Sequence, residues 1–137
     1  MLSSVMKQYL KHMYLLADPI DQVVPSQLAN VLSVNPATVS RMVRKLSNQG
    51  WVKFEQYGRV YLTHEGKQLG KTLVKHNEVL EQFLKIIRGK DDYLLNEIND
   101  LEFNISPYLI KKIEVLTQYL RALLLDRFPV SLGDNVL

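Results

Sequence analysis

Apolar residues recur at helical spacing in three successive segments at the start of the chain. The first segment covers about residues 3–17 and ends before a proline. The second is the short segment SQLANVL. The third, ATVSRMVRKLSNQ, follows Asn35 and Pro36, which are an N-cap residue and a proline at the first helical position. A glycine stops this third segment, so the pattern predicts three helices in close succession.

The pattern then changes from helical spacing to alternation. The segment WVKFEQYGRVYLT alternates apolar and polar residues around Tyr57 and Gly58, and the glycine supplies the backbone conformation of a tight turn. The segment therefore predicts a two-stranded hairpin. Three helices followed by such a ribbon within about 60 residues are typical of a winged helix-turn-helix.

Beyond the hairpin the chain returns to helical spacing. Thr63 is placed to cap a long helix that runs to about Arg88, and Asp91 begins a further helix. The pair Ser106-Pro107 repeats the cap-and-proline signal before a last, strongly apolar helix. We predict a mainly α fold, with an N-terminal winged helix-turn-helix followed by an all-helical dimerisation domain. The predicted boundaries are 1–63 for the DNA-binding domain, 64–90 for a long connecting helix, 91–128 for the helical dimerisation region and 129–137 for a loose C-terminal tail.

Charge is divided unevenly along the 137 residues. Residues 1–75 carry ten Lys or Arg and four acids, a net charge of +6, whereas residues 76–137 carry seven bases and ten acids, a net charge of −3. A basic first half indicates a polyanionic partner. The chain has no cysteine, which excludes disulfides, thiolate zinc sites and thiol nucleophiles. No apolar run approaches the ~18 residues of a membrane span, and no signal peptide is visible, so we expect a cytoplasmic protein.

The third predicted helix and the hairpin carry side chains that suit DNA. In a winged helix-turn-helix the third helix enters the major groove and the ribbon lies along the backbone. Basic side chains bind phosphates and guanine edges, and hydroxyls bind phosphates or bases. The predicted DNA-contacting residues are Pro36, Ala37, Thr38, Ser40, Arg41, Arg44 and Lys45 of the helix, and Lys53, Tyr57 and Arg59 of the hairpin.

Two further expectations concern partners and activity. One such module reads few base pairs, so we expect a homodimer on a double-stranded DNA operator, joined through the apolar C-terminal helices. The alternative is that these helices form only an intrachain core. The chain contains no His-Glu-x-x-His sequence and no glycine-rich phosphate loop, and we expect neither an enzyme nor a small-molecule substrate.

Long stretches of the chain resemble the diphtheria-toxin-repressor family, in its manganese-transport-regulator branch. The resemblance covers about residues 5–120 and is carried by PATVSRMVRKL, LTHEGKQLGKTLV and LEQFLKII. It implies a homodimeric winged-helix regulator, and a repressor is the expected role. In this family, operator binding requires Mn(II) or Fe(II) in sites between the DNA-binding and dimerisation halves.

The metal ligands that the resemblance implies are largely replaced in this chain. The family has an acid-x-x-acid pair on the first helix, one histidine on the long fourth helix, and Glu-x-x-Glu-His after the fifth. The matching residues here are Gln8, Lys11, Asn77, Asn99, Glu102 and Phe103. Only Glu102 is a carboxylate, whereas hard divalent ions prefer several anionic oxygens. We therefore expect no metal cofactor, and Mn(II) or Fe(II) only if the site is rebuilt, for instance from Glu102 with Asp100, His76 or a main-chain carbonyl.

The replacement of an acid by Lys11 suggests a specific alternative to metal. The ammonium of Lys11 has no lone pair to give a cation, but it could pair with Glu102 in place of one. Gln8, Asn77 and Asn99 would then complete a neutral hydrogen-bond network. The alternatives are that Lys11 reaches into solvent, or that the chain acts as a hetero-dimeric modulator of a metal-sensing relative. His76 lies one residue before the position of the family's histidine. One residue along a helix turns the side chain by ~100°, so we expect His76 to pack against apolar neighbours rather than to bind a metal.

Overall fold

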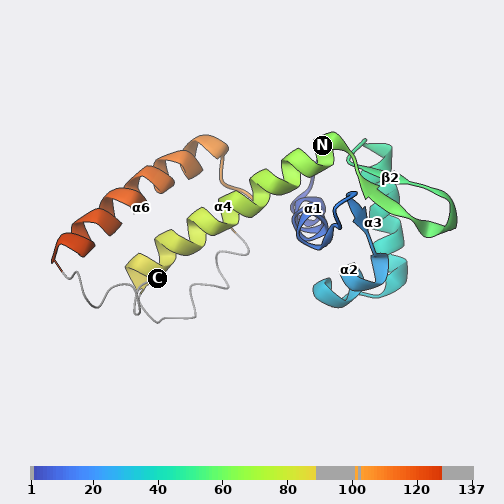
Figure 1. Cartoon of the computed structure of the whole chain (residues 1–137), viewed down its shortest axis with the longest axis horizontal. Coiled ribbons are helices and arrows are strands. Elements are labelled where there is room, and N and C mark those ends of the chain that lie inside the picture. Colours follow the sequence, from blue (N-terminus) through green and yellow to red (C-terminus); the bar gives the residue numbers. More distant parts are fainter. Residues whose placement is uncertain (1, 89–100, 102, 128–137) are drawn as a thin grey trace. The chain divides into compact units, whose positions relative to one another are not determined.

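The computed structural model describes residues 2–88, 101 and 103–127, and its elements follow the predicted order (Figure 1). The mainly α class with an N-terminal winged helix-turn-helix is confirmed. Contacts divide the chain into two compact units, Met1–Val74 and Lys75–Leu137, here the first and second unit. The elements are α1 (Ser4–Leu16), β1 (Gln22–Val23), α2 (Pro25–Leu32), α3 (Pro36–Asn48), β2 (Val52–Phe54), the 3-10 turn η1 (Gln56–Gly58), β3 (Val60–Leu62), α4 (His64–Arg88) and α6 (Pro107–Arg127).

The core of the first unit is built from the apolar stripes of its helices and the inner face of its sheet. Each stripe predicted from periodicity turns inward, so the hydrophobic effect fixes which face of each helix is covered. Val39, Met42, Val43 and Leu46 form the apolar stripe predicted for α3, and of these only Met42 is half-buried rather than buried. The largest fully buried side chains are Leu10, Met13, Val23, Leu28, Val39, Val43, Leu46 and Val60.

The sheet has three strands, so the prediction of a two-stranded hairpin was incomplete. β1 pairs antiparallel with β3, with Gln22 opposite Tyr61, and β2 pairs with the other edge of β3. A strand of two residues is too short to show alternation, so the sequence pattern does not reveal it. The carboxylate of Asp18 shapes the turn before β1, because it accepts hydrogen bonds from the backbone N–H groups of Ile20 at 3.0 Å and Gln22 at 2.8 Å.

Two glycines allow the start of α4 to pass close to other backbone. A Cβ built on Gly66 would lie 1.9 Å from the carbonyl oxygen of Trp51. A Cβ on Gly70 would lie 2.7 Å from the Cβ of Tyr14 and 3.0 Å from the carbonyl oxygen of Leu10. Both positions therefore require the absence of a side chain.

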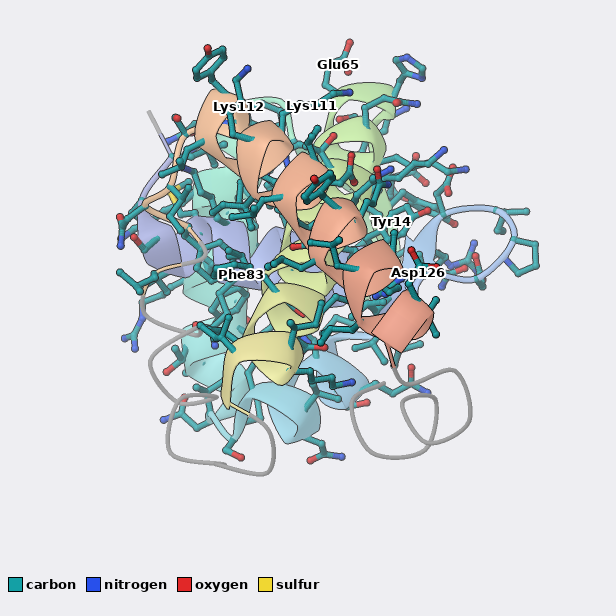
Figure 2. The ribbon with its side chains drawn as sticks, turned by 90° about the vertical axis from the view of Figure 1, so that its left-hand side faces the viewer. Tyr14, Glu65, Phe83, Lys111, Lys112 and Asp126 are labelled. Carbon is teal, nitrogen blue, oxygen red and sulfur yellow. The ribbon has the colours of Figure 1, made fainter. Side chains whose placement is uncertain are left out.

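In the second unit, α6 packs beside the second half of α4 (Figures 1 and 2). The side chains of Val79, Leu80 and Ile110 form its buried cluster, with Leu84, Ile105 and Ile113 packed against them. At the first turn of α6 the hydroxyl of Ser106 accepts a hydrogen bond from the N–H of Leu109 at 3.2 Å, which confirms the predicted cap. Figure 2 shows Lys111 and Lys112 toward the start of α6 and Asp126 toward its end.

Some predicted features lie outside the described residues. These are the helix expected from Asp91, the former ligand positions Asn99 and Glu102, and the tail 129–137. None of the helices in the described ranges combines the length and the apolar run that a membrane span requires.

Candidate nucleic-acid interface

The outer face of α3 is basic and open to solvent. Ser40, Arg41, Arg44 and Lys45 are exposed, whereas Val39, Val43 and Leu46 turn into the core. This separation follows from helical spacing, since the apolar residues recur every three or four positions. The sequence of α3 contains no acid, so its three cations face solvent with no opposing charge on the same helix.

The start of α3 is held by its N-cap. The side-chain oxygen of Asn35 accepts hydrogen bonds from the backbone N–H of Thr38 at 2.8 Å and from the Thr38 hydroxyl at 2.9 Å. The hydroxyl proton of Thr38 is therefore already engaged in the cap, and its oxygen receives a long contact of 3.5 Å from the guanidinium of Arg41. Pro36 and Ala37 are exposed beside it. Thr38, predicted to contact DNA, orders the helix N-terminus in this structure.

The turn between β2 and β3 carries the other predicted DNA-contacting side chains. Lys53, Tyr57 and Arg59 are all exposed, and Tyr57 retains 95% of its accessible surface. The turn is closed by a hydrogen bond of 2.8 Å from the N–H of Glu55 to the carbonyl oxygen of Arg59. The ammonium of Lys53 lies 3.7 Å from a carboxylate oxygen of Glu55, an exposed ion pair that a phosphate can displace at small energetic cost.

The sequence did not single out Phe54, which lies beside these residues. Its ring is 50% exposed at the end of β2, although Val60 opposite it is buried. Phe54 lines a hollow of about 510 Å³ together with Glu55, Gln56, Tyr57 and Arg59. Its position in the alternating pattern predicts an inward side chain, whereas in the structure Phe54 is the last residue of β2 and is half exposed.

The former metal-ligand positions offer a poor donor set. Gln8 is exposed, Asn77 is half-buried and Phe103 is buried. Lys11, at a position where the resemblance implies a carboxylate, is only 8% exposed. Within the described ranges, no group of three or more His, Cys, Asp or Glu side chains could hold a metal ion. Of the four described positions, only the amide oxygens of Gln8 and Asn77 could serve as donors to a hard divalent cation.

His76, which we expect to pack against apolar neighbours, lies beside a carboxylate of α6. Its imidazole is half-buried on the part of α4 that belongs to the second unit. Burial lowers its pKa below the usual value of 6.5, and the nearby carboxylate of Glu114 opposes this shift. The ammonium of Lys75 lies 3.7 Å from the same carboxylate.

The fold and this surface define a winged helix-turn-helix DNA-binding transcription regulator. Comparison with known proteins identifies the family. The family model that describes the iron-dependent repressor N-terminal DNA-binding domain matches residues 1–60 of this chain. The HTH-type transcriptional regulators MntR of Bacillus subtilis (strain 168) and Bacillus velezensis are each 35% identical to this chain over 114 residues, 83% of this chain and 80% of each relative. The chain therefore belongs to the diphtheria-toxin-repressor family of metalloregulators, and the resemblance seen in the sequence is confirmed.

Solved structures agree with this assignment. The manganese regulator SloR is 26% identical, with a TM-score of 0.70, and the match covers 83% of this chain and 54% of that one. A manganese-dependent transcriptional repressor solved with manganese is 28% identical, with a TM-score of 0.67. The match covers 83% of this chain and 53% of that one. This chain thus spans about half the length of the two solved chains.

Proposed function

We propose that this protein is a homodimeric transcriptional repressor that binds a double-stranded DNA operator through α3 and the β2–β3 turn. One observation carries the proposal: of the ten predicted DNA-contacting side chains, nine are exposed on two neighbouring elements of the first unit, and Thr38 is half-buried. α3 would lie in the major groove and the turn beside the backbone. The proposal places the protein in the cytoplasm with its operator, and it assigns no catalytic activity and no small-molecule substrate.

A second copy of this chain is the partner proposed for α6. One face of α6 packs on α4, but the rest of the helix leaves six large apolar side chains between 47% and 72% exposed, namely Leu109 and five that are grouped on the opposite face. These five residues form the α6 stripe, namely Tyr108, Val115, Leu116, Tyr119 and Leu123. The last four residues follow Tyr108 by seven, eight, eleven and fifteen positions. At 3.6 residues per turn, these spacings place all five on one side of the helix. An exposed apolar stripe of this length indicates a protein interface, and self-association would bury two copies of it.

We infer further that the repressor binds its operator without Mn(II) or Fe(II). The relatives named above include a manganese regulator and a manganese-dependent repressor. In this chain, however, three of the former ligand positions on described residues hold neutral side chains and the fourth holds Lys11. A buried ammonium repels a divalent cation and gives it no lone pair. The donor set therefore favours a regulator that has dispensed with the metal.

Lys11 suggests what replaces the metal. Its side chain is 8% exposed, which does not suit the alternative in which the ammonium reaches into solvent. A buried ammonium is stable only beside an anion or several hydrogen-bond acceptors. We propose Glu102 as the anion, because it is the one carboxylate among the former ligand positions. The ammonium of Lys11 would place a fixed positive charge beside Glu102, where the resemblance implies a bound cation.

Fluorescence anisotropy on labelled DNA from upstream of the protein's own gene tests these proposals. One titration contains EDTA and the other excess Mn(II), at fixed salt. We expect equal, sequence-specific affinity in both, and at least a tenfold loss for Arg44→Ala. Lys11→Ala should lower both operator affinity and melting temperature. Lys71→Ala, which removes an exposed lysine from α4, should change neither.

Each other outcome overturns a defined part of the proposal. Binding that requires Mn(II) would show that a rebuilt metal site exists. A Lys11→Ala variant that matches the parent in affinity and melting temperature would exclude the ion pair. Specific binding that arises only after mixing with a metal-sensing relative would replace the homodimer by a hetero-dimeric modulator.

A further inference from the structure

Tyr57 has a conformation and an exposure that the fold itself does not explain. Its backbone φ is +64°, in the left-handed region that favours glycine and asparagine, and Gly58 follows at +72°. The side chain is 95% exposed, so its ring contributes almost nothing to the core. A glycine at this position would adopt the same backbone conformation without strain. A large aromatic ring held in a strained conformation in solvent points to a partner rather than to stability.

The position of Tyr57 indicates which partner it meets. The β2–β3 turn projects from the helices of the first unit (Figure 1). Only Gln49–Trp51 separate α3 from β2, and the N–H of Trp51 donates to the carbonyl oxygen of Leu46 at 3.0 Å, which ties the hairpin to the end of α3. A duplex bound along α3 therefore continues past the turn. The net charge of +6 on residues 1–75 favours such a polyanion.

The chemistry of the turn fits a minor groove better than a phosphate alone. A phenol carries no charge and releases no counterion, so it adds nothing to the salt-dependent part of phosphate binding. Its hydroxyl can donate to the N3 of adenine or the O2 of thymine, which are the acceptors of the minor groove. Its ring, with that of Phe54, offers apolar surface to the deoxyribose edges, and the guanidinium of Arg59 beside the same hollow suits the adjoining phosphate.

We propose that Tyr57 enters the minor groove that flanks the α3 site and gives the protein a preference for A·T pairs there. This inference rests on the proposed operator binding. A G·C pair places the guanine N2 amino group in the minor groove, where it obstructs the ring and puts a donor between the acceptors that the hydroxyl uses. The preference therefore concerns positions that α3 does not touch.

Substituted duplexes test this directly by anisotropy at fixed salt. The parent duplex is one that the protein binds specifically, and its flanking pairs are changed from A·T to G·C or to inosine·C. Inosine lacks the N2 amino group, so the inosine·C pair keeps the major-groove pattern of G·C and the minor-groove pattern of A·T. We expect G·C flanks to weaken binding by about tenfold and inosine·C flanks to restore it.

Two variants connect the preference to the side chain. Tyr57→Gly should bind A·T and G·C flanks equally, while its midpoint of urea unfolding stays equal to or above that of the parent. Tyr57→Phe should retain part of the affinity and lose most of the flank preference, because it keeps the ring without the hydroxyl. Suppose that Arg44→Ala abolishes binding, but the parent protein binds A·T and G·C flanks equally. This result would overturn the inference about Tyr57 and leave the proposed operator binding intact. A parent protein that binds no duplex would overturn both proposals.

Discussion

The hydroxyl oxygen of Thr63 lies 2.7 Å from the carbonyl oxygen of Gly50, to which it donates a hydrogen bond across thirteen residues of chain. The same hydroxyl lies 3.0 Å from the carbonyl oxygen of Trp51, and it accepts the N–H of Gly66 at 3.1 Å. A single side chain thus joins the residues after α3 to the first turn of α4. From the sequence we predicted only that Thr63 caps α4, and not its hydrogen bonds to Gly50 and Trp51.

Loss of this hydroxyl should destabilise the first unit. Thr63→Val keeps the shape of the side chain but leaves two carbonyl groups and one N–H without this partner, so we expect the free energy of unfolding to fall by about 1–3 kcal/mol. Urea unfolding followed by circular dichroism measures the change. Thr63→Ser retains the hydroxyl and should recover most of the stability. Equal stability of the valine and serine variants would contradict this role.

Gly70→Ala should also destabilise the protein, against the ordinary helix preference. In an exposed helix interior alanine is favoured over glycine by about 1 kcal/mol. Here the new Cβ would lie 2.7 Å from the Cβ of Tyr14 and 3.0 Å from the carbonyl oxygen of Leu10, so α1 and α4 must separate. We expect a net loss of about 1–3 kcal/mol in thermal or urea unfolding. A variant as stable as the parent would show that the two helices can move apart freely.

His76 should make stability depend on pH below neutrality. Its pKa is lower in the folded protein than in the unfolded chain, mainly because burial disfavours the charged imidazolium. The unfolded state therefore binds the proton more readily, and stability falls as pH decreases below about 6.5 until the folded-state pKa is passed. His76→Gln should show a shallower decline of the unfolding midpoint between pH 7 and pH 5. An unchanged slope would assign the dependence to other groups.

Charge placed on the α6 stripe should prevent self-association. We expect Leu116→Lys combined with Tyr119→Lys to sediment as a monomer in analytical ultracentrifugation under conditions in which the parent is a dimer, because two buried ammonium groups per copy would lose their hydration. The single variant Gln118→Lys adds charge to an exposed position of the same helix outside the stripe and should remain dimeric. Monomeric parent protein would refute the proposed interface.

Phosphate contacts by α3 should be visible in the salt dependence of binding. Each lysine or arginine that neutralises a phosphate contributes nearly one unit to the slope of log affinity against log salt. Lys45→Ala should reduce this slope by about one unit for every duplex tested. Lys71→Ala supplies the matched control. An unchanged slope for Lys45→Ala would place Lys45 away from the DNA backbone.

Several features of the fold were predictable because they depend on neighbours in sequence. Asn35 caps α3 from three residues away, Ser106 caps α6 in the same manner, and the apolar stripe of α3 follows from its own period. The candidate DNA-contacting residues were predictable for the same reason. Once the inward face of α3 is known, Arg41 and Arg44 must point outward.

Other features depend on segments far apart in the chain, and only the tertiary structure decided them. β1 exists because the turn at Asp18 brings two residues to the free edge of β3, and a pair of residues has no recognisable period. The alternating pattern did not predict the exposure of Phe54. The stripe on α6 is visible only once the other face of the helix is covered by α4. The sequence by itself determined the helices of the winged helix-turn-helix, the caps at Asn35, Thr63 and Ser106, and the basic surface, since these are set by residue type and local spacing. The replacement of metal ligands follows from the resemblance to the family. The tertiary structure decided that Lys11 is buried, because burial depends on which distant segments pack around a side chain.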